Sequence, residues 1–235
     1  MNNLKILGSL LVIFAVAPQI EAARLAYGHQ AANQFRIQLG AQTPDGDSAY
    51  WDDKKVDFTG GPDDFEDVAF AVDYRRFISP LVAIQVSAEA YEGDAEQEYI
   101  DFVDEFGSPI FHSTNLEQNS FGLGVAFFPA GRDRLLIPYV GAGGEIVSWR
   151  LTEAGDFIDF TADEPIVFDD FFVDEHEAFG YYLQAGVEIA FGEGWALFAE
   201  GRWDRVDDEL EGDFAGLGEL DLSSKRVSVG IAWTF

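Results

Sequence analysis

The sequence contains no cysteine, and basic residues are scarce. Without cysteine, disulfides cannot stabilise the fold, so its stability must come from packing and backbone pairing. Only 14 Lys and Arg residues stand against 43 Asp and Glu residues, and the formal net charge is −29. A surface of this charge repels nucleic acid and anionic head groups, which argues against a nucleic-acid partner.

Long hydrophobic runs are also missing beyond the first residues. Residues 1–22 have a short polar start with one lysine and an apolar run over 6–16, which is typical of a signal peptide cleaved before Ala23. Residues 23–32 are then expected to be a periplasmic lead-in. No later segment approaches the roughly 20 apolar residues that a transmembrane helix requires. A membrane-spanning form of the mature chain must therefore be a closed β-barrel.

What the sequence has in abundance is strict alternation of apolar and polar residues, the period of a β-strand with two different faces. The last segment places Val227, Val229, Ile231, Trp233 and Phe235 on one face and Arg226, Ser228 and Thr234 on the other. Seven further segments repeat this pattern, and the eight predicted strands cover 33–42, 68–75, 82–89, 120–127, 135–149, 182–189, 197–204 and 224–235.

The predicted connections alternate between short and long. Turns are short at Pro80, Gly131 and Gly192, whereas the connections at 45–67, 92–117, 150–177 and 207–221 are long and acidic. An even number of antiparallel strands with short turns at one rim and long loops at the other is typical of a transmembrane barrel. The predicted fold is all-β, with a single barrel over residues 33–235.

Alternation alone does not distinguish a membrane barrel from a soluble, ligand-carrying barrel, since both have one apolar and one polar face. Glycines favour the membrane barrel, because they share the polar face and would make room for long side chains inside a narrow lumen. These glycines are Gly40, Gly122, Gly124, Gly141, Gly143, Gly186 and Gly230.

Two sequence motifs resemble those of a known family: Ile-Pro-Tyr-Val-Gly-Ala-Gly-Gly at 137–144 and Val-Gly-Ile-Ala-Trp-Thr-Phe at 229–235. With them, residues 33–235 resemble the small eight-stranded bacterial outer-membrane β-barrels of the OmpA/OmpX-like class. The resemblance implies short periplasmic turns, long extracellular loops and a location in the outer membrane of a Gram-negative bacterium. It also implies insertion by the barrel-assembly machinery, which would read the last strand through Val229, Ile231, Trp233 and Phe235. A peptidoglycan-binding domain, as in OmpA itself, is not expected.

The predicted inward face carries charges of both signs. A charge removed from water must be paired, so these residues are expected to form an ion-pair network that plugs the lumen. The predicted network consists of Arg36, Asp73, Arg75, Glu89, Glu145, Glu188, Glu200, Arg202 and Arg226.

These features predict a monomeric, non-enzymatic barrel without cofactor or metal site, serving envelope structure or surface interaction. Its expected partners are outer-membrane lipids, lipopolysaccharide and an extracellular partner at the acidic loops. Aromatic residues in these loops, such as Tyr50, Trp51 and Phe171, either pack onto the rim or bind that partner.

Two alternatives remain open. A narrow porin-like channel would use the luminal charges to select small solutes. A lipid-modifying enzyme would require His112 or His176, both placed in predicted loops, to meet a serine at the rim, because His29 precedes the barrel.

Overall fold

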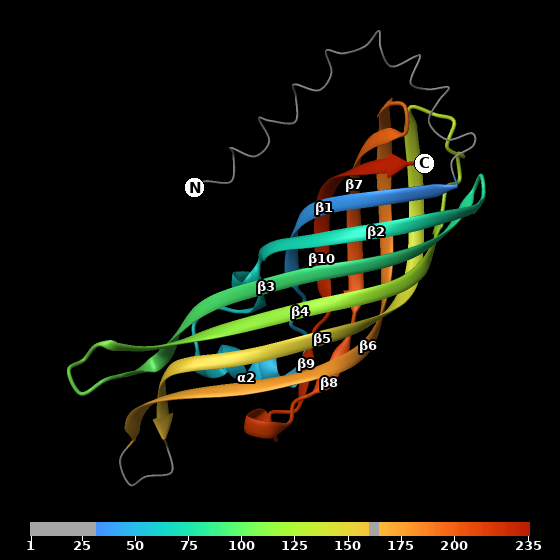
Figure 1. Ribbon diagram of the computed structural model, residues 1–235. Coiled ribbons are helices and arrows are strands. Elements are labelled where there is room, and N and C mark those ends of the chain that lie inside the picture. Colours follow the sequence, from blue (N-terminus) through green and yellow to red (C-terminus); the bar gives the residue numbers. More distant parts are fainter. Residues whose placement is uncertain (1–31, 160–164) are drawn as a thin grey trace.

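The computed structural model describes residues 32–159 and 165–235 and forms a closed antiparallel barrel (Figure 1). The predicted signal peptide and nearly all of the predicted lead-in lie outside these residues. The strands follow the ring order β1-β10-β7-β6-β5-β4-β3-β2, and pairing of β1 with β2 closes the ring. Their bounds are β1 Asn33–Pro44, β2 Asp67–Ser79, β3 Val82–Val103, β4 Pro109–Phe127, β5 Leu136–Asp159, β6 Ile166–Gly192, β7 Trp195–Arg205 and β10 Ser224–Thr234.

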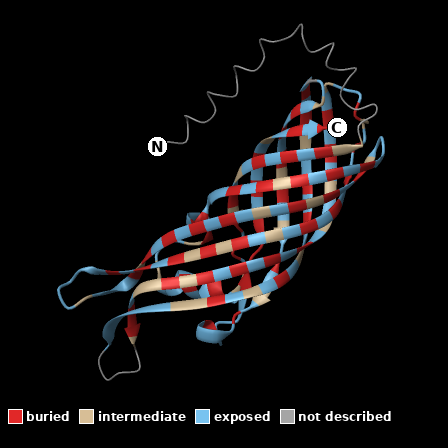
Figure 2. Cartoon of the chain, viewed as in Figure 1, coloured by how far each residue is buried: buried red, intermediate tan, exposed pale blue. Residues whose placement is uncertain are grey.

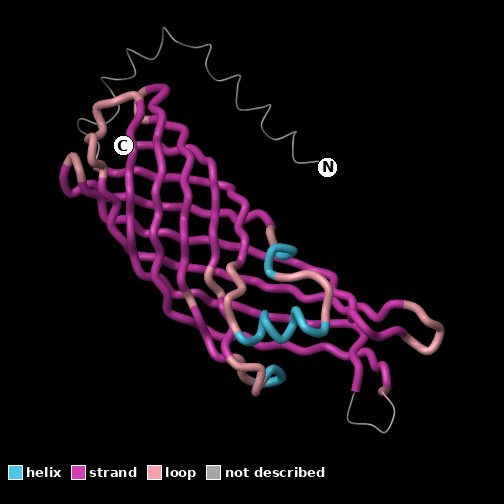
Figure 3. The backbone as a smooth tube through the Cα atoms, turned by 180° about the vertical axis from the view of Figure 1, so that it is seen from behind, coloured by secondary structure: helices cyan, strands magenta, loops and turns pink. Residues whose placement is uncertain are grey.

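Five short elements lie at the long-connection end of the barrel, which Figure 3 shows from behind. The connection after β1 holds helix α2 (Ala49–Asp57) and the 3-10 turn η2 (Pro62–Phe65). The connection after β7 holds a small hairpin of β8 (Asp207–Glu209) and β9 (Glu219–Asp221), with η3 (Gly212–Phe214) between them. No helix formed by the described residues has the length and hydrophobicity needed to cross a lipid bilayer.

The prediction of loops at 92–117 and 150–177 is wrong, because most of these residues continue the strands. β3 and β4 pair from Val82 and Phe127 out to Val103 and Pro109, and β5 and β6 pair out to Asp159 and Ile166. The alternation continues here with a changed composition. On β3 the outward residues Glu92, Asp94 and Glu96 are acidic, and the buried inward residues are Tyr91, Gly93, Ala95 and Gln97. On β4 and β5 the outward residues are mostly polar, and the buried inward residues include Leu116, Trp149 and Leu151. Beyond the closed ring, β3, β4, β5 and β6 therefore form an open four-stranded sheet, which we call the outer sheet.

The prediction that the polar face is inside is confirmed. Along β10, Val227, Val229 and Ile231 are exposed, whereas Arg226 and Ser228 are buried. Figure 2 shows the same alternation of buried and exposed residues on every strand of the ring. The exposed large side chains of the ring form a continuous apolar belt, which ends on β4 at Phe121 and on β5 at Ile146.

The luminal glycines make room for aromatic rings as well as for polar chains. A methyl group added to Gly143 would lie 2.5 Å from the Leu123 carbonyl oxygen and 2.6 Å from the Tyr182 ring. One added to Gly186 would collide with the Tyr139 hydroxyl. The two tyrosine rings therefore fit inside the barrel only because their cross-strand partners on the neighbouring strand are glycines.

Adjacent glycines on β5 provide a test of this packing. Gly143→Ala should destabilise the folded barrel by about 1–3 kcal/mol, the usual cost of overpacking. Gly144→Ala is the matched control, because Gly144 faces outward and its added methyl would have the Gly180 carbonyl oxygen 3.7 Å away as its nearest neighbour. Urea unfolding in micelles measures both. Equal stability of the two variants would contradict this packing.

Candidate functional site

The lumen next to the short turns is organised around Arg36 on β1. Its guanidinium lies 3.2 Å from Asp73 and 3.0 Å from Glu200, and it donates a 2.8 Å hydrogen bond to the Tyr139 hydroxyl. The same group stacks over the Phe198 ring at 3.7 Å. Arg36 is fully buried, so these contacts replace its hydration shell.

Arg75 on β2 makes the second set of contacts. It lies 2.9 Å from Glu188 and 3.7 Å from Glu200, and it donates a 2.7 Å hydrogen bond from Nε to Gln85. Its guanidinium also lies over the Tyr139 ring, at 4.3 Å. Glu200 thus joins the ion pairs of Arg36 and Arg75 across the barrel.

Arg202 and Arg226 form the part of the network nearer the outer sheet. Arg202 pairs with Glu145, contacts Asp204 at 2.6 Å and stacks over the Tyr182 ring at 3.9 Å. Arg226 pairs with Glu89. The structure therefore brings all nine predicted network residues into the lumen, each with at least one ion pair.

Several luminal contacts are additional to the predicted network. Asp204 lies on the expected inward face and contributes a sixth carboxylate to the lumen, and Tyr139 and Tyr182 contribute ring faces for the arginines. A set of glutamines fills the spaces between the charges: Gln85 and Gln184 bond to one another, Gln34 donates to Glu188, Gln38 to Asp73 and Gln42 to Gln118. Alternation placed these side chains inside, but it carries no information on which of them meet across the barrel.

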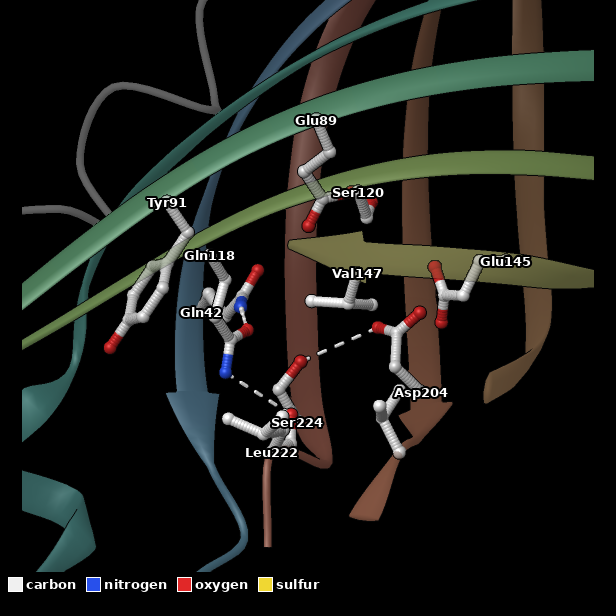
Figure 4. A pocket seen from close by; sticks show the side chains of 11 residues that line it. Gln42, Glu89, Tyr91, Gln118, Ser120, Glu145, Val147, Asp204, Leu222 and Ser224 are labelled. Carbon is white, nitrogen blue, oxygen red and sulfur yellow. Dashed lines mark hydrogen bonds between the residues drawn. The ribbon is translucent and has the colours of Figure 1, made fainter. Parts of the chain in front are cut away.

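A small cavity of about 10 Å³ marks the upper limit of this network. Figure 4 shows the carboxyl groups of Glu145 and Asp204 pointing towards one another across it, with Glu89 on the facing strand. A space of this size holds about one water molecule, so it interrupts the packing without opening a path along the lumen.

An apolar cluster covers the lumen above the cavity, and we call it the cap. Tyr50 and Trp51 of α2 are its central side chains, with the Trp51 ring 5.0 Å from Tyr50 and 5.1 Å from Phe65. The inward face of the outer sheet and the hairpin after β7 supply the rest: Ala95, Leu116, Val147, Trp149, Leu151, Ala178, Val206, Leu210, Phe214, Leu220 and Leu222. Of the two roles open to the loop aromatics, Tyr50 and Trp51 thus take the packing role.

One buried polar cluster fastens α2 to the outer sheet. Lys54 lies 2.7 Å from Glu153 and 3.1 Å from Nε2 of His112, and Tyr50 donates a 2.6 Å hydrogen bond to Glu153. His112 is therefore a buried residue of β4, not a loop residue as predicted, and its ring stacks on Phe157 at 5.2 Å. His176 also lies on a strand, β6, where it is 3.0 Å from Asp174.

Burial changes the proton affinity of this cluster. Desolvation, with the Lys54 charge as a second cause, lowers the pKa of His112 to about 3. Desolvation also lowers the pKa of Lys54, although Glu153 opposes the effect, and it raises the pKa of Tyr50 well above its usual value. The ring of His112 is thus neutral at ordinary pH and accommodates the adjacent ammonium group.

The predicted assembly signal lies on the outer face of the barrel. Val229, Ile231, Trp233 and Phe235 are all exposed there, and the Trp233 ring stacks on Trp195 at 6.0 Å and on Phe235 at 4.5 Å. The outward orientation leaves the four side chains accessible from the bilayer. Their recognition by an assembly machinery stays a prediction.

Acid should weaken the cap through His112. Because its folded pKa lies below the unfolded value of 6.5, the unfolded state binds more protons between pH 6.5 and about 3. The contribution of His112 to stability is therefore complete above pH 6.5 and declines by up to about 1.4 kcal/mol per pH unit as the pH falls through this window. Tryptophan fluorescence of Trp51 and Trp149 would follow the loss of the cap.

His112→Phe should remove this part of the acid dependence, since a phenyl ring fits the same aromatic surroundings without titrating. His176→Asn is the matched control on the neighbouring wall and should keep the acid dependence of the parent. An identical acid response in His112→Phe and the parent would refute the assignment.

Comparisons with known proteins agree with this architecture. The family model described as "Outer membrane protein beta-barrel domain" matches residues 8–235. No curated protein matches the sequence. Among solved structures, OprG from Pseudomonas aeruginosa is similar, with 13% identity and a TM-score of 0.53 over 89% of this chain and 99% of OprG.

Two further structures share the fold at low identity. Neisserial surface protein A (NspA) has 13% identity and a TM-score of 0.52, covering 86% of this chain and 97% of its own. A major outer membrane protein from Thermus thermophilus has 12% identity and a TM-score of 0.50, covering 87% of this chain and 100% of its own. By the extent of the family match, this chain belongs to the outer membrane protein beta-barrel domain family and resides in the outer membrane of a Gram-negative bacterium.

Proposed function

We propose that this outer-membrane barrel is a sealed, non-enzymatic scaffold for envelope structure and surface interaction, with the outer sheet as its working surface. The observation that carries the proposal is the double closure of the lumen. Arg36, Arg75, Arg202 and Arg226 cross it with their carboxylate partners, and the cap covers its extracellular end. An eight-stranded barrel is only just wide enough for its own side chains, which fits a packed interior.

The porin-like alternative needs a continuous wetted path. In its favour, the lumen is charged and contains a small cavity near Glu145. Against it, Arg36 and Arg75 are fully buried among aromatic rings and carboxylates, and Tyr50 and Trp51 are buried above them. Conduction would therefore require both the ion pairs and the cap to rearrange.

The enzymatic alternative needs a histidine beside a nucleophile at an accessible rim. His112 is buried between Lys54 and aromatic rings, and His176 lies against Asp174 and Trp149. Within residues 32–159 and 165–235, neither ring contacts a serine hydroxyl. These surroundings favour a structural role for both histidines.

Lipids and lipopolysaccharide are the proposed partners of the outer wall. The apolar belt would contact acyl chains, and the polar positions directly above it, such as Glu92, Glu117 and Arg150, would face the head groups. The exposed C-terminal row at Val229, Ile231, Trp233 and Phe235 would serve assembly and then anchor the barrel in lipid.

Single-channel recording in planar bilayers tests the proposal. The folded barrel, identified by its heat-dependent gel migration, should show no discrete openings. Regular cation-favouring openings of the unaltered barrel would overturn the sealed lumen and establish the porin-like alternative.

Opening the network on purpose gives a second test. The double variant Arg36→Ala with Arg226→Ala strips buried carboxylates of their partners, which costs about 3–5 kcal/mol for each broken pair. We expect a lower melting temperature and the appearance of channel openings. Arg150→Ala is the matched control, because its pair with Glu175 is exposed to solvent and should contribute little to stability. Unchanged stability and conductance in the double variant would contradict a paired, sealing interior.

A further inference from the structure

The outer face of the outer sheet ends in an exposed apolar patch, which we call the tip face. It consists of Ile100 on β3, Phe111 on β4, Ala154 on β5 and Phe171 on β6. Ala154 lies directly opposite Phe171 and is a diagonal neighbour of Phe111, because Ser113 is its partner on β4. Cross-strand neighbours of this kind are within reach of each other, so Phe111, Ala154 and Phe171 form one surface. Ile100 lies two residues beyond Glu98, the β3 partner of Phe111, where the pairing of β3 with β4 shifts register. The exposed Ile100 borders this surface on β3.

These side chains are exposed although the same strands have an apolar interior available. Ile100 is 51% exposed, Phe111 41% and Phe171 60%. Phe172, the inward neighbour of Phe171, is partly buried and packs against the cap. A contiguous apolar surface of this kind, on a part of the protein that lies in water, is typical of an interaction site.

The tip face does not belong to the membrane belt. Phe111 lies ten residues beyond Phe121, the last belt residue of β4, which is about 33 Å along an extended strand. The outward positions between them are polar: Asn119, Glu117, Asn115 and Ser113. Lipid acyl chains therefore do not cover the tip face.

The charge around the tip face indicates which kind of partner it can bind. Residues 92–117 and 151–177 contain no lysine or arginine. Carboxylates adjoin the tip face on the same side of the sheet, from Glu96 and Glu98 on β3, Asp156 on β5 and Asp169 on β6. Asp156 and Asp169 are direct cross-strand partners, an arrangement that costs stability. A second copy of the chain would bring the same charges together, and phosphate-bearing ligands would be repelled.

We propose that the tip face binds a cationic amphipathic protein segment, whose apolar side covers Phe111 and Phe171 and whose lysines or arginines meet the carboxylate rim. This inference rests on the proposed role of the outer sheet as an interaction surface and specifies the partner that fits it. An apolar centre within a charged rim is the usual anatomy of such an interface, with the aromatics as anchors and the rim steering association.

The probe is an amphipathic helical peptide with leucine on one face and lysine on the other, titrated onto the barrel in nanodiscs, with empty nanodiscs as background. It should bind the barrel above that background, and affinity should fall with added salt. The same peptide with glutamate in place of lysine should not bind. No binding above background, or equal binding of the glutamate peptide, would overturn the inference.

Variants distinguish binding of the peptide at the tip face from its non-specific electrostatic attraction to an acidic protein. Phe111→Ser with Phe171→Ser keeps every charge and should weaken binding by about tenfold or more, the loss typical of aromatic anchors. Val56→Ser removes an apolar side chain of α2 that is more exposed than either phenylalanine and lies outside the tip face, and it should leave binding unchanged. Full affinity in the phenylalanine double variant would refute the tip face as the site.

The rim is tested separately by Asp156→Asn with Asp169→Asn, which should weaken binding and its salt dependence while raising thermal stability. Heat-dependent gel migration confirms that each variant is folded. If the barrel conducts ions but still binds the lysine peptide, only the proposal of a sealed lumen is rejected. If the barrel shows no channel openings and does not bind the lysine peptide, only the assignment of the tip face as a binding site is rejected.

Discussion

The structure depends on one constraint, the pairing of every backbone amide and carbonyl group that faces lipid. A bilayer offers these groups no hydrogen-bond partners, so the strands must close into a ring without a free edge. The contact between β1 and β10 is therefore as necessary as any hairpin, although its residues lie at opposite ends of the chain. Once the ring is closed, alternation assigns each side chain either to lipid or to the lumen.

The narrow ring imposes a second constraint, because its interior has little room and no bulk water. Four guanidinium groups are placed there with six carboxylates, and each makes contact with a charge of the other sign. Tyrosine rings stack on the arginines and occupy the space left by glycines on the neighbouring strand. Size and charge thus act together: the small residues admit the long ones, and the long ones neutralise each other.

Above the lipid the constraint disappears, and the strands behave differently. The outer sheet is open at its edges, and its inner face is covered by α2 and by the hairpin of β8 and β9, as in an ordinary water-soluble β-structure. The same four strands therefore face lipid in the ring and water in the outer sheet. Their outward residues are apolar against lipid, then polar or acidic in water, and apolar again at the tip face.

Alternation along the sequence was enough to predict the barrel, its strand number and its two faces, because a period of two residues is a local property of any β-strand. It also identified every charged member of the luminal network except Asp204, since inward position follows from alternation alone. It did not reveal the outer sheet, because acidic outward residues such as Glu92 and Asp94 look like loop composition when the apolar belt is the expected signal.

The folded barrel was needed to learn which luminal groups meet, that Tyr50 and Trp51 cap the barrel, and that His112 is buried against Lys54. Each of these contacts joins residues far apart in the chain, and the register between strands fixes them. Register is a property of the closed ring and its packing, whereas alternation belongs to each strand alone.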